Sequence, residues 1–265
     1  MPRFDENIYT NTYPFILKKD IVYSPTFYTQ IPNWHDDIEI EYIKEGEAFL
    51  YIDGKKFLVQ TGSFVFIPPN AIHQLVPTTN VKYSCLLINP QFFRSIESSE
   101  NIASPFFDEE LTEIFFQFES LASALDSPHS KMKIYYNLFK QFIIINERHT
   151  SLQETIINNT PHQTKIKEAI IYIRNHFSEK LTLDTIAGRV YMSKFDFSRR
   201  FKDITNMTVI EFVNYYRCKI AASKISEGFS VCEAALSSGF ENMSYFTKTF
   251  KKYFHRSPSQ YKHKK

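Results

Sequence analysis

The sequence predicts an α+β protein of two domains: an N-terminal antiparallel β-barrel with a helical hairpin, followed by an all-α domain with two helix-turn-helix motifs. Short segments rich in β-branched and aromatic residues dominate the first ninety positions. Apolar residues then recur at helical spacing, and one helix–turn–helix pattern occurs twice, over 183–204 and 231–253. We therefore expect a first domain at 1–148, a linker at 149–163 and a second domain at 164–265.

Five strands are expected in the barrel, each bounded by turn residues. They are Ile38–Ile43, Ala48–Ile52, Lys56–Val59, Ser63–Ile67 and Val81–Ile88. Asp53-Gly54 predicts a two-residue hairpin, because Asp and Gly tolerate the positive φ that such a turn requires. Several short strands at even spacing are typical of a small antiparallel barrel or sandwich.

The helical hairpin is expected over residues 104–148. Two helical stripes of apolar residues lie there, separated by Ser127-Pro128: Leu111, Ile114, Phe115, Phe118, Leu121 and Leu125, then Ile134, Leu138, Phe139, Phe142 and Ile143. Both stripes are wide and aromatic, so either they pack entirely on the barrel or part of them forms a subunit contact. We expect a homodimer through this hairpin.

The linker is expected to be polar and turn-rich, and helical periodicity resumes at Ile166. In the first motif, Ser193 is the predicted N-cap of a helix with Phe197, Phe201 and Ile204 on its buried side. Phe246 and Phe250 repeat the two phenylalanines 49 positions later. A helix–turn–helix presents a helix end to the DNA major groove, and two of them can read groove segments about 34 Å apart.

Charge is distributed unequally between the halves. Residues 1–160 carry 12 Lys/Arg and 20 Asp/Glu (net −8), and residues 161–265 carry 19 and 9 (net +10), which sum to the +2 of the chain. The basic half indicates a polyanionic partner, here double-stranded DNA. No run of 18 apolar residues and no secretory leader is evident, and the three cysteines are odd in number and widely spaced. We expect a cytoplasmic protein without a membrane partner.

Residues that lie off the buried stripes are the candidates for DNA contacts: Phe195, Ser198, Arg199 and Lys202 in the first motif, and Met243, Ser244, Thr247, Lys248 and Lys251 in the second. Arg199 can donate a fork of hydrogen bonds to guanine, a contact that discriminates bases by about 1–3 kcal/mol. Lys202 is better placed for phosphates, which position the protein without specifying sequence.

The second domain resembles the DNA-binding domain of AraC/XylS-family transcription regulators over about 100 residues. The motifs that carry the resemblance include Ile186-Ala187, Phe197-Ser198-Arg199, Ser244-Tyr245-Phe246 and Ser257-Pro258. The resemblance implies that the outward residues of the two motifs contact bases. His255 departs from the family pattern, in which Gly is usual, and a left-handed backbone there would suit His less well than Gly.

The barrel half resembles the cupin-like ligand-binding domain of the same family through Glu39, Gly46, Gly62, Pro68 and His73. In metal-bearing cupins, a His-x-His-x3-Glu set and a later His converge on one ion. The corresponding residues here are Asn33, His35, Glu39 and His73, so the first His is missing.

We therefore favour a pocket in which His35, Glu39 and His73 hydrogen-bond a small polar effector, with sugars among the expected classes, and we expect no metal or cofactor. In the alternative interpretation, Glu39 and Glu41 lie on a solvent face and His35 in a loop. Trp34 either stacks on a sugar ring or anchors the barrel.

The function expected is that of a ligand-responsive, sequence-specific transcription regulator of carbohydrate or other small-molecule metabolism genes. It is not expected to be an enzyme, because the sequence contains no Gly-x-Gly-x-x-Gly, no Gly-Lys-Ser/Thr and no nucleophile–base set. The alternative is a metal-dependent cupin enzyme fused to a helical domain, with His35, Glu39 and His73 as the metal ligands.

Overall fold

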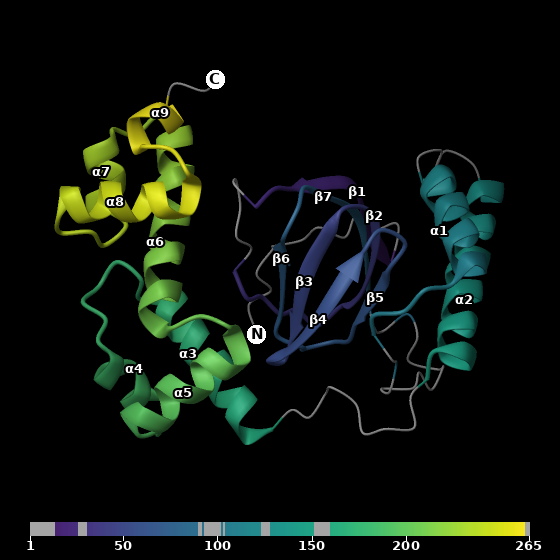
Figure 1. Cartoon of the computed structure of the whole chain (residues 1–265), viewed down its shortest axis with the longest axis horizontal. Helices are drawn as coiled ribbons and strands as arrows, with labels where there is room; N and C mark the ends of the chain where they lie inside the picture. Colours follow the sequence, from purple (N-terminus) through teal and green to yellow (C-terminus); the bar gives the residue numbers. More distant parts are fainter. Residues whose placement is uncertain are drawn as a thin grey trace.

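The computed structural model describes residues 14–25, 31–89, 92, 102, 104–122, 128–150 and 160–262. It confirms the two-domain α+β fold class (Figure 1). In Figure 1 the barrel lies in the middle, with the hairpin α1–α2 on one side and the C-terminal helices on the other. No helix in these described ranges is long and apolar enough to cross a membrane.

Two antiparallel sheets form the barrel, with strand orders β1-β7-β2-β5 and β4-β3-β6. The strands are β1 (Phe15–Tyr23), β2 (Ile38–Glu45), β3 (Glu47–Ile52), β4 (Lys55–Gln60), β5 (Phe64–Ile67), β6 (His73–Pro77) and β7 (Val81–Ile88). The expected hairpin turn is present, with φ of +47° at Asp53 and +84° at Gly54. The sequence did not reveal β1, where a register shift between Lys18 and Ile21 interrupts the pattern, or β6, which has five residues and begins with His73 and Gln74.

Strand β2 is buried on both faces, and this fact overturns the alternative of a solvent face for Glu39 and Glu41. Side chains alternate along a strand, so Ile38, Ile40 and Tyr42 point outward and join the core shared with α1 and α2. Glu39 and Glu41 therefore point the other way, into the space between the two sheets. Two carboxylates inside an otherwise apolar barrel mark the place where a polar site is expected.

The helical hairpin consists of α1 (Glu109–Ala122) and α2 (Pro128–Arg148). Its buried residues, among them Phe115, Phe118 and Leu138, pack on the outer face of the β1-β7-β2-β5 sheet. The opposite side of α2 carries an apolar stripe that the barrel leaves uncovered: Met132 is 74% exposed, Tyr136 67% and Ile143 54%. Leu125, which the sequence placed in the first stripe, lies outside the described residues.

Seven helices of the described chain follow: α3 (Pro161–Asn175), α4 (Leu183–Arg189), α5 (Lys194–Thr205), α6 (Val209–Ser226), α7 (Val231–Leu236), α8 (Met243–Phe254) and α9 (Pro258–Lys262). Helices α4–α5 and α7–α8 are the two helix-turn-helix units, at opposite ends of α6 (Figure 1). Helix α3 begins inside the expected linker, because Thr160 and Gln163 form a capping box. That capping box was mistaken for part of a polar loop.

One hydrophobic core connects the second domain with the barrel. Phe201 and Phe250 are fully buried in it, and the same cluster includes Ile31, Trp34 and Ile72 from the barrel side. Trp34, with its ring 5.3 Å below the Arg174 guanidinium, is therefore part of the domain interface. The two domains share packed apolar contacts, which can transmit a change in one to the other.

Candidate functional site

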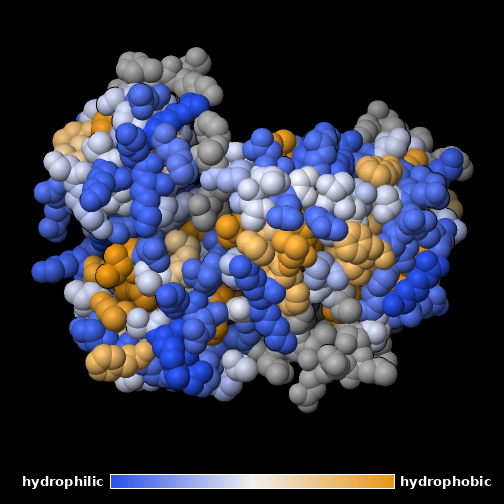
Figure 2. Space-filling model, in the orientation of Figure 1, coloured by the Kyte–Doolittle hydropathy of each residue, from blue (hydrophilic) through white to orange (hydrophobic). Residues whose placement is uncertain are grey.

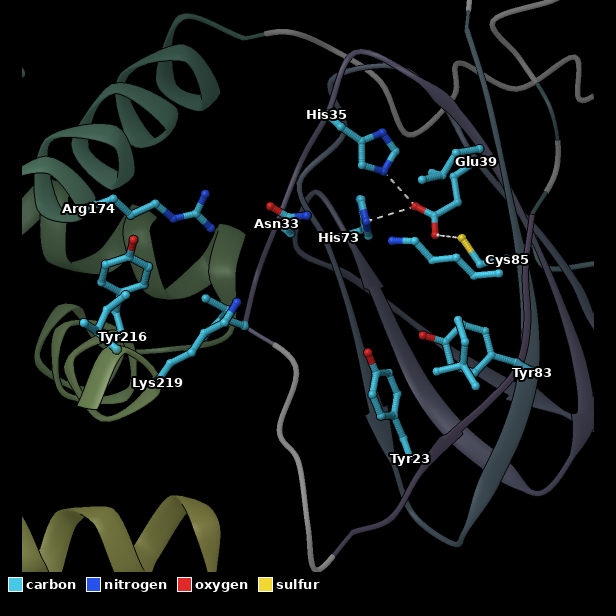
Figure 3. Close-up of a pocket in the computed structure, with 15 residues that line it drawn as sticks. Tyr23, Asn33, His35, Glu39, His73, Tyr83, Cys85, Arg174, Tyr216 and Lys219 are labelled. Atoms are coloured by element: carbon cyan, nitrogen blue, oxygen red, sulfur yellow. Dashed lines mark hydrogen bonds and ion pairs between the residues drawn. The ribbon is translucent and has the colours of Figure 1, made fainter. Parts of the chain in front are cut away.

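A cavity of about 370 Å³ opens between the barrel and helices α3 and α6. This volume lies within the range of small-molecule sites, roughly 300–1,000 Å³. Its residues come from β1, the loop before β2, strands β2, β6 and β7, and the two helices: Lys18, Ile21, Tyr23, Ile31, Asn33, His35, Glu39, His73, Tyr83, Cys85, Leu87, Arg174, Tyr216, Lys219 and Ile220. Figure 3 shows the barrel side chains and those of the helices facing each other across this space.

Glu39 is the centre of the polar side chains on the barrel side. Its Oε2 lies 2.8 Å from Nε2 of His35 and 3.2 Å from Nε2 of His73. Its Oε1 accepts a hydrogen bond from the thiol of Cys85 at 2.8 Å. The structure thus brings together the three residues that the sequence predicted and adds Cys85, as the dashed lines in Figure 3 indicate.

Backbone hydrogen bonds hold the two histidines in place. Asn33 and His73 exchange backbone N–H···O bonds of 3.0 and 2.8 Å, which join the loop before β2 to the start of β6. The amide of Asn70 donates to the carbonyl oxygen of His35 at 2.7 Å. His35 and His73 are 38 positions apart in the sequence, and these bonds bring their rings to 5.1 Å.

Electrostatics favour an ionised Glu39. Burial alone would raise its pKa, but the charges and hydrogen bonds of His73 and His35 hold the pKa well below the usual range. Burial would likewise lower the pKa of His35, and Glu39 outweighs this effect and raises it. Burial and the neighbouring charge of Glu39 raise the pKa of Glu41 well above its ordinary value, which favours its neutral form. Glu39 is the carboxylate of β2 that lines the cavity.

The second domain contributes Arg174 from α3 and Tyr216 and Lys219 from α6. Arg174 donates to the carbonyl oxygen of Pro32 at 3.4 Å, across the domain boundary. Burial lowers the pKa of Arg174 to about 10, so the guanidinium keeps its positive charge at neutral pH. These residues could not be found from the sequence, because helical periodicity indicates which side chains point away from the core but not which surface they face.

The first recognition helix, α5, presents most of its predicted residues to solvent. Phe195 is 84% exposed, Arg199 and Lys202 are exposed, and Ser198 is half-buried. Asp196 accepts from Arg199 at 3.1 Å and from Arg200 at 2.9 Å. Arg199 is thus exposed but already engaged by a neighbouring carboxylate.

The second recognition helix, α8, exposes Ser244, Thr247, Lys248 and Lys251. Met243, predicted to face outward, is instead half-buried and packs against the core. It lies at the first helical position, directly after the N-cap Asn242. On the face shown in Figure 2, hydrophilic side chains project from the lobe formed by the C-terminal helices.

Both recognition helices end at a residue in the left-handed conformation. Asn206 after α5 has φ +56°, and His255 after α8 has φ +53°. The two positions are 49 residues apart, the interval of the sequence repeat. The left-handed backbone considered for His255 from the sequence is therefore present.

The barrel contacts the end of the first recognition helix through the β3–β4 turn. A Cβ atom on Gly54 would lie 2.4 Å from the backbone oxygen of Asp203, which belongs to α5. Glycine is required here both by the close approach and by its φ of +84°. Residues 193–195, at the beginning of α5, are exposed, while the end of this helix is packed against the barrel.

A cavity shared by a barrel and a double helix-turn-helix domain defines a class: a regulator that senses a small molecule and binds DNA. Comparison with known proteins agrees. The family model for an AraC-like ligand binding domain matches residues 22–139, and that for a helix-turn-helix domain matches residues 186–264. The chain belongs to the AraC family of transcription regulators.

Among its relatives, the uncharacterized HTH-type transcriptional regulator YdeC of Bacillus subtilis is 25% identical over 87% of this chain and 85% of its own length. The Transposon Tn10 TetD protein of Escherichia coli is 30% identical over 39% of this chain and 76% of its own length. The fold is similar to that of an apo ToxT variant from Vibrio cholerae, with a TM-score of 0.50, 17% identity, and coverage of 95% of this chain and 98% of the ToxT chain.

Proposed function

We propose that this regulator binds a small, oxygen-rich effector in the cavity and that the occupied cavity alters how α5 and α8 bind DNA. The observation that carries this proposal is the shared lining, because barrel residues and residues of α3 and α6 face the same space. A ligand there contacts both domains and can favour one arrangement over another.

The chemistry of the lining indicates the effector class. Lys18, Arg174 and Lys219 carry positive charge, and Tyr23 and Tyr83 offer hydroxyl groups. A sugar suits the hydroxyl and imidazole partners, and a sugar acid additionally suits the lysines and the arginine. We therefore propose a sugar or sugar acid as effector and genes of its metabolism as targets.

The effector proposal is tested by a thermal-shift screen of sugars and sugar acids on the full chain. Lys219→Ala should weaken the response to an acid that binds, whereas Lys224→Ala, on the same helix but outside the cavity, should not. Equal responses in the two variants would place the ligand elsewhere.

For DNA, we propose that Arg199 reads a base and that Lys202 binds a phosphate. Fragments selected from the genomic DNA of the source organism would supply the operator. Arg199→Ala should weaken binding to the operator by about 1–3 kcal/mol while nonspecific binding stays nearly constant. Lys202→Ala should weaken binding to all sequences alike and reduce the salt dependence. A uniform loss with Arg199→Ala would make Arg199 a phosphate contact.

We further propose that the chain forms a homodimer through α2. Met132, Tyr136, Phe139 and Ile143 follow one another at intervals of 4, 3 and 4 residues and are all exposed. This spacing forms one helix stripe of the kind that pairs helices. Light scattering should show a dimer for the wild type and for Lys133→Glu, and a monomer for Ile143→Glu; a dimer in all three would rule out this contact.

A further inference from the structure

Three electron-pair donors converge at the barrel side of the cavity. Ligand atoms of His35, Glu39 and His73 all lie within 4.8 Å of one another. The two imidazole Nε2 atoms are 2.8 and 3.2 Å from the same carboxylate oxygen. Atoms bonded to one zinc ion at about 2.0–2.1 Å lie roughly 3 Å apart when their bonds meet near a right angle. The two separations therefore match neighbouring positions around one ion.

The orientation of the two rings supports the same interpretation. Nδ1 of His35 lies 3.1 Å from the carbonyl oxygen of Asp37, and Nδ1 of His73 lies 3.0 Å from that of Ala71. A carbonyl oxygen can only accept, so both Nδ1 atoms carry the hydrogen in these bonds. Each Nε2 is therefore the ring nitrogen that faces Glu39; it donates to the carboxylate in the structure, and it becomes a metal ligand when an ion displaces its proton. Anchoring the far ring nitrogen to a carbonyl is how proteins orient metal-binding histidines.

The donors also belong to a frame that needs little rearrangement. Glu39 lies within β2 and is paired with Ile67 of β5 and Leu87 of β7. The bridge between Asn33 and His73 fixes the start of β6 beside the loop that carries His35. All three side chains are therefore held by backbone hydrogen bonds before an ion arrives.

We propose that His35, Glu39 and His73 bind a divalent transition-metal ion in the wall of the effector cavity. Imidazole nitrogen favours zinc, iron, copper or nickel over magnesium and calcium, which prefer oxygen ligands. Three protein ligands leave further coordination positions for water or an effector. The proposal departs from the sequence-based expectation of no metal. It deepens the proposed effector site, and its regulatory meaning rests on that proposed function.

Metal-free full-length protein titrated with Co²⁺ tests the proposal, because cobalt bound by protein ligands gives visible absorption. We expect saturation at one equivalent and displacement by Zn²⁺. His73→Gln and Glu39→Gln should each weaken Co²⁺ binding by more than about 100-fold, beyond the loss typical of residues that only orient the ligands. His176→Ala, which removes the histidine of the exposed His176–Glu179 pair, should leave binding unchanged.

Circular dichroism shows whether each variant is folded, and His73→Gln decides the question if Glu39→Gln does not fold. Absence of Co²⁺ binding to wild-type protein, or equal binding by wild type and His73→Gln, would overturn the proposal. Operator binding measured alongside separates the two hypotheses. If a sugar acid alters DNA affinity but the wild-type protein does not bind metal, the metal site is overturned and the effector proposal stands. If the protein binds one equivalent of metal but no sugar or sugar acid alters DNA affinity, the metal site is supported and the effector proposal fails.

Discussion

The two recognition helices are built alike but are connected differently to the sensing domain. Each begins at a polar N-cap, Ser193 or Asn242, and each ends at a left-handed residue. Helix α8 packs on α6, α7 and α9, whereas the end of α5 meets the β3–β4 turn of the barrel. The repeat therefore gives two similar DNA-binding elements. The contact between the β3–β4 turn and the end of α5, which is not part of the repeat, makes α5 a direct neighbour of the barrel.

The largest expected effect is on the free energy of unfolding, and it tests whether the two helix-turn-helix units have equivalent cores. Phe201→Ala and Phe250→Ala each remove a fully buried ring at equivalent positions. Each should lower the free energy of unfolding by about 3–5 kcal/mol. Urea unfolding followed by circular dichroism measures the loss. A loss below about 1 kcal/mol in only one variant would show that the two cores are not equivalent.

The connection to the barrel is tested next through Asp53, beside Gly54. Burial raises the pKa of Asp53 to about 6, although the amide of Ile72 and the charge of Lys167 oppose this effect. Charged groups that act on Asp53 also include His73 and Lys55. Because the folded pKa lies above the ordinary value of 3.8, the contribution of Asp53 to stability is greatest below pH 3.8 and is lost as pH rises through 6.

Asp53→Asn should remove this decline, which amounts to roughly 1–3 kcal/mol. Asn keeps the oxygen that accepts from Ile72 and also tolerates the positive φ. Asp20→Asn is the matched control, because Asp20 also has a positive φ but its hydrogen bond with Lys44 lowers its pKa. Unfolding measured from pH 4 to 7 should flatten for Asp53→Asn only. The same slope in wild type and Asp53→Asn would contradict the buried carboxyl.

The smallest effect concerns the two helix ends. His255→Gly should stabilise the chain by about 0.5–1 kcal/mol. A left-handed backbone costs an L-residue about 1–2 kcal/mol, and the larger conformational entropy that glycine loses on folding cancels part of the gain. Asn206→Gly should gain less, because Asn tolerates this conformation. Thermal unfolding of both variants measures the difference. A larger gain at Asn206 would reverse our explanation of His255.

Helices and tight turns, which depend on residues close together in the sequence, were for the most part predicted correctly. Helical spacing placed α5 and α8, and Asp53-Gly54 placed the hairpin turn. Strand β1 was missed because Lys18, Lys19 and Asp20 interrupt its apolar pattern, and its partner β7 lies some sixty residues away. Long-range pairing, which no sequence window contains, supplies the stability of such a strand.

The residues of the candidate site also fall into those that could be found from the sequence and those that could not. His35, Glu39 and His73 could be found from the resemblance to cupins, whereas Arg174 and Lys219 enter the cavity only because the domains pack together. Met243 was placed on the outward face by helical spacing, but in the structure it is half-buried and packs against the core. The resemblance therefore predicted the three polar residues of the barrel site, and domain packing added Arg174 and Lys219.

The contact at Gly54 bears most directly on the claim that the barrel controls the first recognition helix. Residues 1–160, which include the barrel, carry a net charge of −8, and a barrel held against α5 should therefore repel DNA phosphates that approach this helix. A methyl group at Gly54 would displace the barrel from Asp203. Gly62→Ala is the matched control, since Gly62 has φ +90° and a Cβ there meets only Phe107 at ordinary distance.

Operator affinity of these two variants is the decisive measurement. Gly54→Ala should bind about tenfold more tightly than wild type, about 1.4 kcal/mol, with the difference shrinking as salt rises. Gly62→Ala should bind like wild type. Unchanged or weaker binding by Gly54→Ala, or an equal change in both variants, would contradict control of α5 by the barrel.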